Sequence, residues 1–146
     1  MAMKKAPPVR STEYLDKIIR ERFSGTLMSD RKWVKLLGRL VDHAHLVKKC
    51  RVKLVWEEDS GRELFIHPHQ SYQFDYYASA MEGMVSGPPG GWYAYREIEW
   101  IAFPRHTGTG SGDPVQDLQA IHRLLEPVAE LSVEMGEEAL KIYGYK

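Results

Sequence analysis

The sequence has almost no cysteine and no long apolar run. Cys50 is its only cysteine, so no disulfide can form within the chain. No apolar stretch approaches the roughly 20 residues that a membrane-spanning helix needs. Residues 1–10 also lack the apolar core of a secretory signal. These absences predict a protein without a membrane segment in a reducing compartment, most simply the cytoplasm.

A net charge is also lacking, but the charges are unevenly placed. Residues 1–56 hold 14 Lys and Arg against 5 Asp and Glu, whereas residues 57–146 hold 6 against 15. Either the two halves neutralise each other within one domain, or one of them forms a charged patch that steers a partner. The content of 43% hydrophobic and 27% charged residues is typical of a globular domain.

The N-terminal part of the chain is predicted to be helical. Residues 1–10 contain two prolines and are expected to form a flexible arm before a single domain over residues 11–146. Ser11 can cap a first helix that runs to about Phe23, with Tyr14 on its buried side. A second helix starts after Ser29 or Asp30 and carries an apolar stripe at helical spacing: Trp33, Leu36, Leu37, Leu40 and Val41.

Alternating residues predict an antiparallel sheet in the middle of the chain. Residues 50–56 and 63–66 are expected to form a hairpin, and residues 72–76 and 92–103 are expected to continue the sheet. In the last of these strands, Ile98, Trp100 and Ala102 would share one face, opposite Glu97, Glu99 and Ile101. We therefore expect three or four strands.

The C-terminal part is predicted to return to helix. The glycine-rich residues 106–112 suit a flexible linker. Asp113 and Pro114 then supply a helix cap and a first-turn proline, and Pro127 would kink or split the helix that follows. A helical turn is expected over residues 139–143. The predicted fold is α+β, with N-terminal helices, a three- to four-stranded antiparallel sheet and C-terminal helices packed on it.

Two His-x-His pairs are candidates for a metal site. His43, His45, His67 and His69 could together offer four imidazoles to zinc. The first pair falls at a helix end, where side chains at i and i+2 point roughly 200° apart, and the second pair straddles a proline. We therefore predict no cofactor. A small metal-binding protein or enzyme that uses these pairs, if the four histidines converge, is kept as an alternative.

Other motifs resemble parts of catalytic or ligand-binding sites without completing one. Cys50 has no nucleophile signature around it. The glycine-rich residues 108–112 lack the Gly-Lys-Ser/Thr ending of a phosphate-binding loop. Glu97 and Glu99 would lie about 7 Å apart along a strand, a spacing that also fits a solvated face. No catalytic residue is predicted, and a nucleic-acid adaptor using the basic residues 1–56 remains a further alternative.

Aromatic and acidic residues gather around the Gly-Pro turn at residues 87–91. Tyr and Trp dominate protein interfaces, and neighbouring carboxylates suit a basic protein partner. An additional hydrophobic core would explain the aromatic residues equally well. The interpretation as a protein interface assigns partner binding to Asp75, Tyr76, Trp92, Tyr93, Glu97 and Glu99.

Three short motifs lie within residues 30–104: Arg31-Lys32-Trp33, Arg51-Val52-Lys53-Leu54 and Glu97-Ile98-Glu99-Trp100-Ile101. In these motifs the chain resembles a family of small bacterial proteins associated with the immunity proteins of polymorphic toxin systems. The resemblance implies a cytoplasmic protein that binds and inhibits a cognate toxin, and it implies no catalytic residues.

Overall fold

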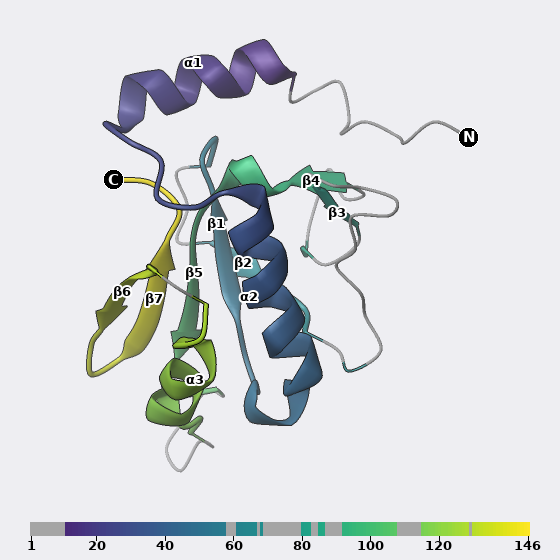
Figure 1. Cartoon of the computed structure of the whole chain (residues 1–146), viewed down its shortest axis with the longest axis vertical. Coiled ribbons are helices and arrows are strands. Elements are labelled where there is room, and N and C mark those ends of the chain that lie inside the picture. Colours follow the sequence, from purple (N-terminus) through teal and green to yellow (C-terminus); the bar gives the residue numbers. More distant parts are fainter. Residues whose placement is uncertain are drawn as a thin grey trace.

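The computed structural model describes residues 11–57, 61–66, 68, 80–82, 85–86, 92–107, 115–128 and 130–146. Over these residues the chain has three α-helices, a five-stranded antiparallel sheet and a separate two-stranded sheet (Figure 1). The α+β class is confirmed. The predicted arm at residues 1–10, the strand at residues 72–76 and the glycine-rich residues 108–112 lie outside the described residues.

Both N-terminal helices form where they were predicted. Helix α1 spans Thr12–Arg22 and helix α2 spans Asp30–Asp42. The hydroxyl of Ser11 accepts a hydrogen bond from the Tyr14 backbone N–H at 3.2 Å. The hydroxyl of Ser29 accepts one from the Lys32 N–H at 3.1 Å. Each serine thereby satisfies a donor that the first helical turn leaves free.

The two helices bury different amounts of surface. All five apolar stripe residues of α2 are buried, whereas α1 buries only Leu15, against Val55 and Tyr145. Tyr14 is 45% exposed, so its predicted place on the buried side is wrong. Helix α1 packs on the rest of the molecule along one side only, and Leu15 is its one fully buried residue in this contact.

The large sheet has the strand order β2-β1-β5-β7-β6, and every pair in it is antiparallel. Its strands span the following residues: β1 Arg51–Leu54, β2 Arg62–Glu63, β5 Ile98–Pro104, β6 Ser132–Met135 and β7 Ala139–Tyr143. The small sheet pairs β3 (Ala80–Glu82) with β4 (Trp92–Ala94). Short 3₁₀ turns, η2 (Ala44–Leu46) and η3 (Tyr95–Glu97), precede β1 and β5.

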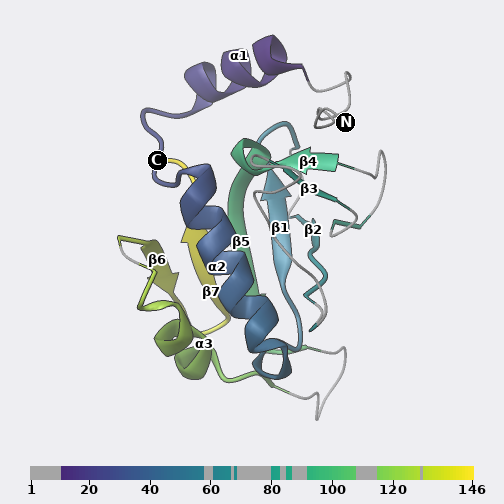
Figure 2. The same ribbon diagram turned by 45° about the vertical axis from the view of Figure 1, so that its right-hand side comes forward.

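Helices α2 and α3 (Leu118–Leu125) lie on the same face of the large sheet, and α1 lies beyond one end of it (Figures 1 and 2). The main core fills the space between these helices and the sheet. It joins Leu36, Leu40, Ile101, Ile121 and Ile142, each 0% exposed. Burial of each such side chain contributes about 1.5–3 kcal/mol, so this layer holds most of the fold together. None of the helices in the described part of the chain is long and apolar enough to cross a membrane.

A bulge in β5 changes which of its side chains face the helices. Lys53 pairs with Trp100, but the next residue, Leu54, pairs with Ile98, so Glu99 has no opposite residue in β1. Ile98 joins the main core, whereas Trp100 does not. The prediction that these two residues share a face is therefore wrong, because the inserted residue shifts the alternation by one position.

The C-terminal part differs most from expectation. Helix α3 starts at Leu118, capped by Asp117, and ends at Leu125, two residues before Pro127. The chain then forms the hairpin β6–β7 where further helix was predicted. Pro127 thus ends the helix, and the last two strands raise the large sheet to five. The cause is visible in the burial of β7, which alternates residue by residue so that Leu140 and Ile142 face the core.

Gly38 gives a direct test of the helical layer. It lies inside α2, and a Cβ placed on it would meet no atom within 4 Å. Gly38→Ala is expected to raise the free energy of unfolding by about 0.5–1 kcal/mol, because alanine loses less backbone entropy in a helix. Urea unfolding followed by tryptophan fluorescence would measure the change. A loss of stability would contradict this placement of α2.

Candidate protein-binding site

Of the six residues predicted to bind a partner, the structure describes the side chains of three: Tyr93, Glu97 and Glu99. Asp75 and Tyr76 lie outside the described residues, and the side chain of Trp92 is not described. Tyr93 and Glu97 are both 0% exposed. A fully buried side chain offers no atoms to a partner, so within the described part only Glu99 keeps some exposure, with 16% of its side chain accessible.

Glu97 forms part of the interior hydrogen-bond network. One of its carboxylate oxygens accepts a hydrogen bond from the Trp56 indole N–H at 2.8 Å. The other accepts one from the Ala94 backbone N–H at 2.6 Å. A buried carboxylate is stable only when such donors compensate its lost hydration. Glu97 therefore links turn η3 by a hydrogen bond to Trp56, which follows β1.

Tyr93 belongs to a neighbouring polar cluster. Its hydroxyl accepts a hydrogen bond from the guanidinium of Arg62 at 3.4 Å. Arg62 also pairs with Glu57 at 2.7 Å and lies over the Trp56 ring, 5.2 Å from the ring centroid. The aromatic side chains described in this region, Tyr93 and Tyr95, are thus buried, as the alternative of an additional core predicts for them.

Glu99 lies on the face of the sheet away from α2 and α3, and it is paired there. Its carboxylate binds the Lys53 ammonium at 2.6 Å and the Arg22 guanidinium at 3.1 Å. Two cations compensate its one negative charge, so Glu99 adds little attraction for a basic partner. Glu97 and Glu99 do not form a carboxylate pair, because the first is buried in a turn and the second is the bulged residue of β5.

A hollow lies between α3 and β6. Its volume is about 230 Å³. Four apolar side chains and three polar ones line it: Leu125, Val128, Leu131 and Val133, with His122, Glu126 and Glu130. Leu125 and Val128 are buried, whereas Leu131 and Val133 are partly exposed. We refer to this hollow and its rim as the α3–β6 groove.

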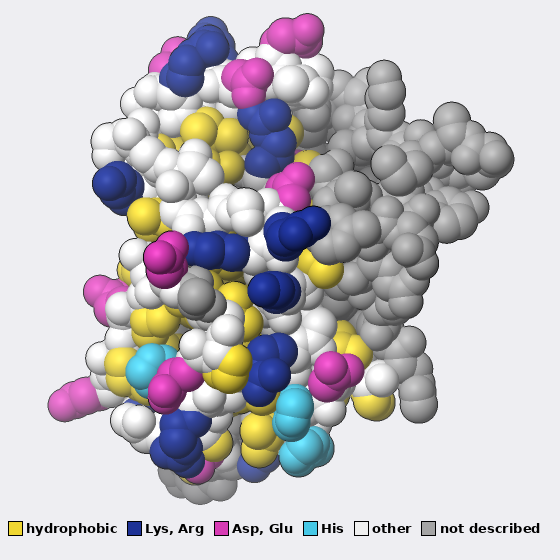
Figure 3. All heavy atoms as spheres, in the orientation of Figure 1, with side chains coloured by type: hydrophobic (Ala, Val, Ile, Leu, Met, Phe, Trp, Pro, Cys, Tyr) yellow, Lys and Arg dark blue, Asp and Glu magenta, His cyan; other side chains and the backbone are white. Residues whose placement is uncertain are grey.

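Exposed carboxylates lie around the α3–β6 groove, with Lys32 and the exposed Arg123 as basic neighbours. Glu126 and Glu130 are exposed at its rim, and Glu134, Glu137 and Glu138 are exposed on the adjoining hairpin. Figure 3 shows carboxylates, basic side chains and a histidine around α3 and β6, with apolar side chains between them. Glu130 lies 3.9 Å from the Lys32 ammonium but keeps 87% of its side chain exposed. Such a pair is largely screened by water, so the rim retains negative charge.

The face of the hairpin away from the helices is also negatively charged at Glu134. Its carboxylate accepts a hydrogen bond from the Tyr143 hydroxyl at 2.9 Å. Burial raises the pKa of Tyr143, and the contact with Glu134 raises it further. Tyr143 is therefore a neutral donor near pH 7. Lys141 is in register with Glu134, and its ammonium lies 4.4 Å from the centroid of the Trp100 ring.

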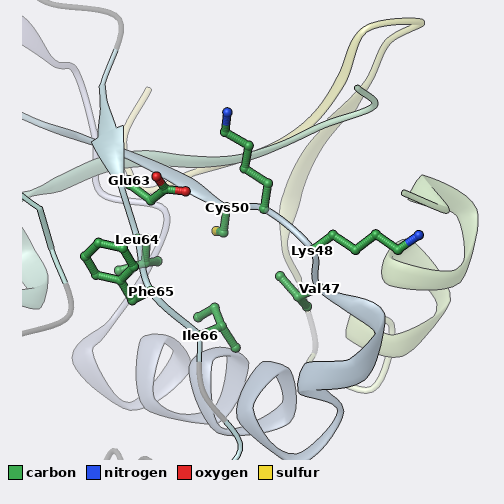
Figure 4. A pocket seen from close by; sticks show the side chains of 8 residues that line it. Val47, Lys48, Cys50, Glu63, Leu64, Phe65 and Ile66 are labelled. Atoms are coloured by element: carbon green, nitrogen blue, oxygen red, sulfur yellow. The ribbon is translucent and has the colours of Figure 1, made fainter. Parts of the chain in front are cut away.

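A second, smaller hollow of about 120 Å³ lies where β1 and the chain after β2 separate. Figure 4 shows the side chains of Val47, Cys50 and Ile66 around it, with Lys48 extending away. Cys50 is 1% exposed, and burial raises the pKa of its thiol. A nucleophilic cysteine needs its thiolate, and burial disfavours the thiolate of Cys50. The position of Cys50 therefore fits a side chain that packs in the core.

The histidine pairs are placed only in part. The rings of His43 and His45 are 6.2 Å apart between centroids, and His43 Nδ1 contacts the Arg39 carbonyl oxygen at 3.2 Å. His67 and His69 lie outside the described residues, so the convergence of the four is untested. Among the residues that the structure does describe, no group of three or more His, Cys, Asp or Glu could hold a metal ion.

The α3–β6 groove was missed at the sequence level although a signal was present. Residues 132–135 and 139–143 are two short alternating runs, and the three residues between them begin with Gly136. This spacing is typical of a β-hairpin. A prediction of this hairpin would have placed an edge strand beside the helix that ends near Pro127.

Comparison of the chain with protein-family models, with curated proteins and with solved structures finds no match.

Proposed function

We propose that this chain is a non-enzymatic binding protein that holds a basic partner protein, and that the partner is a toxin whose activity it blocks. The observation that carries the proposal is the α3–β6 groove, with its apolar floor and acidic rim. The likeness of residues 30–104 to immunity proteins supports the choice of a toxin as partner.

The carboxylates and the apolar floor of the groove would contribute to different steps of binding. Exposed carboxylates attract a basic protein from a distance and speed association. The apolar floor then supplies affinity once an apolar side chain of the partner is buried on it. We therefore move the proposed contact from the aromatic region around residues 92–99 to the surface of α3 and β6.

Charge reversal in the groove is the test. The tagged chain is used as bait to capture its partner from native cells. The double variant Glu126→Lys, Glu130→Lys is expected to recover at least about tenfold less partner than the unchanged chain. Each reversal replaces an attraction with a repulsion. Quantitative mass spectrometry would measure recovery. Growth of cells that co-express the captured partner would measure inhibition, with rescue by the unchanged chain and none by the variant.

A matched control is available on α1. Glu13 and Glu21 are also exposed, but they lie on a different element. Glu13→Lys with Glu21→Lys makes the same change in net charge and is expected to leave recovery and rescue unchanged. Equal losses in both variants would mean that only net charge matters. If no partner is captured and the sample carries one equivalent of zinc, the histidine pairs become the site instead.

A further inference from the structure

Strand β6 is an edge of the large sheet, and half of its backbone groups point away from it. Among the residues that the structure describes, β7 is its one neighbour in that sheet. The Gly136 N–H donates to the Ala139 carbonyl at 2.9 Å, and Glu134 and Ser132 follow at alternate positions in register with Lys141 and Tyr143. Bonding alternates along an antiparallel pair, so the N–H and C=O groups of Val133 and Met135 face outward.

This open edge runs beside the hollow. Val133 contributes its side chain to the hollow and its backbone groups to the edge. A strand paired to β6 would alternate its side chains between the two faces of the sheet. Those on the α3 side would enter the apolar hollow, and those on the other side would lie next to Glu134.

Charge restricts what can occupy the edge. An occupant beside Glu126, Glu130 and Glu134 meets carboxylates on both faces of the sheet. A second copy of this chain, paired through its own β6, would set the two Glu134 side chains near each other, and like charges across a strand pair are destabilising. An alternation of apolar and basic residues complements both faces.

The backbone of Glu130 is a further sign that this carboxylate has a role. Its φ is +60°, the left-handed conformation that glycine adopts at less cost. The Glu130 side chain remains 87% exposed, so packing does not explain a glutamate here. Strain retained at an exposed polar residue is a feature of binding sites.

We propose that the partner binds the α3–β6 groove as an extended segment that adds a strand to β6, with alternating apolar and basic residues. This inference rests on the proposed function and deepens it, since it names the mode of recognition and the chemistry of the partner's contact. Main-chain hydrogen bonds to Val133 and Met135 give affinity, and the hollow and the carboxylates select the side chains.

A synthetic peptide tests the mode without knowledge of the partner. The probe is an acetylated and amidated heptapeptide of alternating lysine and valine. Titration into the ¹⁵N-labelled chain is expected to give saturable shifts of the Val133 and Met135 amides, with a Kd below about 1 mM. A copy with alternate N-methylated backbone nitrogens cannot pair and is expected to bind at least about tenfold more weakly. A glutamate–valine peptide is expected not to bind.

A backbone-neutral variant tests the charge. Glu134→Gln removes the carboxylate on the face that the lysines would meet, and it keeps an acceptor for the Tyr143 hydroxyl, so the fold is expected to be retained. It should weaken the lysine–valine peptide about threefold to fivefold, the size of one exposed ion pair. Glu13→Gln on α1 serves as its control and should leave the Kd unchanged.

The outcomes separate this inference from the function on which it rests. Shifts away from β6, or equal binding of the N-methylated peptide, would overturn strand addition even where charge reversal abolishes capture of a protein partner. Dimerisation through β6, seen by sedimentation, would overturn it in favour of a second copy. Peptide binding at β6 without any captured toxin would support strand addition and overturn the proposed function.

Discussion

Replacement of Glu97 by alanine is expected to lower the free energy of unfolding by about 3–5 kcal/mol. The change leaves the Trp56 indole N–H and the Ala94 backbone N–H without the acceptor that each has in the interior. A buried donor without an acceptor costs about 1–3 kcal/mol, and the vacated volume adds a packing penalty. Urea unfolding at pH 7, followed by tryptophan fluorescence, would measure the loss.

Glu99 supplies the matched control in the same segment. Glu99→Gln keeps the shape of a side chain that is partly exposed and ion-paired with Lys53 and Arg22. Its expected cost is about 1–2 kcal/mol, because the buried Lys53 ammonium loses its counter-ion but keeps the Glu57 carbonyl as an acceptor. A similar, small effect of both substitutions would show that Glu97 is not buried as described, and it would reopen the prediction that the two carboxylates form a contact face.

Replacement of Gly144 by alanine is expected to cost about 3 kcal/mol. A Cβ at this position would lie 2.6 Å from the Ile98 carbonyl oxygen and 3.2 Å from Trp33 Cζ2. The backbone cannot shift freely to relieve the clash. The Gly144 N–H donates to the Glu99 carbonyl, and its own carbonyl accepts from Leu27, both at 2.8 Å. Forced overpacking typically costs 1–3 kcal/mol, and contact with fixed backbone places this site at the upper end.

Gly136 provides the comparison for Gly144. It lies at the end of β6, and a Cβ there would be 3.5 Å from the Ala139 carbonyl oxygen, an ordinary contact distance. Gly136→Ala is expected to change the free energy of unfolding by less than about 0.5 kcal/mol. Thermal unfolding monitored by circular dichroism would compare the two variants, and equal stability would argue against the close approach of β7, β5 and α2.

The elements that were predicted correctly are those specified by local chemistry. The caps at Ser11 and Ser29 act within one helical turn, and the α2 stripe repeats from Trp33 to Val41. Such signals do not depend on distant parts of the chain. Strand β1 and its hairpin partner β2 follow from alternation on either side of a polar turn.

The elements that were predicted wrongly are short and depend on their neighbours. Residues 139–143 include Ala, Leu and Lys, which favour helix, yet they form β7 because β5 and β6 flank them. Strand preference depends on packing against adjacent strands more than on the residue itself. The bulge at Glu99 is also a property of the β1–β5 pair, which the sequence of β5 alone does not reveal.

By itself, the sequence determined the α+β class, the two capped N-terminal helices and the uneven distribution of charge, because these follow from composition and from contacts a few residues apart. Only the tertiary structure decided which charges and aromatic rings reach the surface. It buried Tyr93 and Glu97, and it placed Glu126 and Glu130, which lie between α3 and β6 in the sequence, at the rim of one hollow. The physical reason is that burial depends on which elements pack together, and residues far apart in the sequence settle that packing.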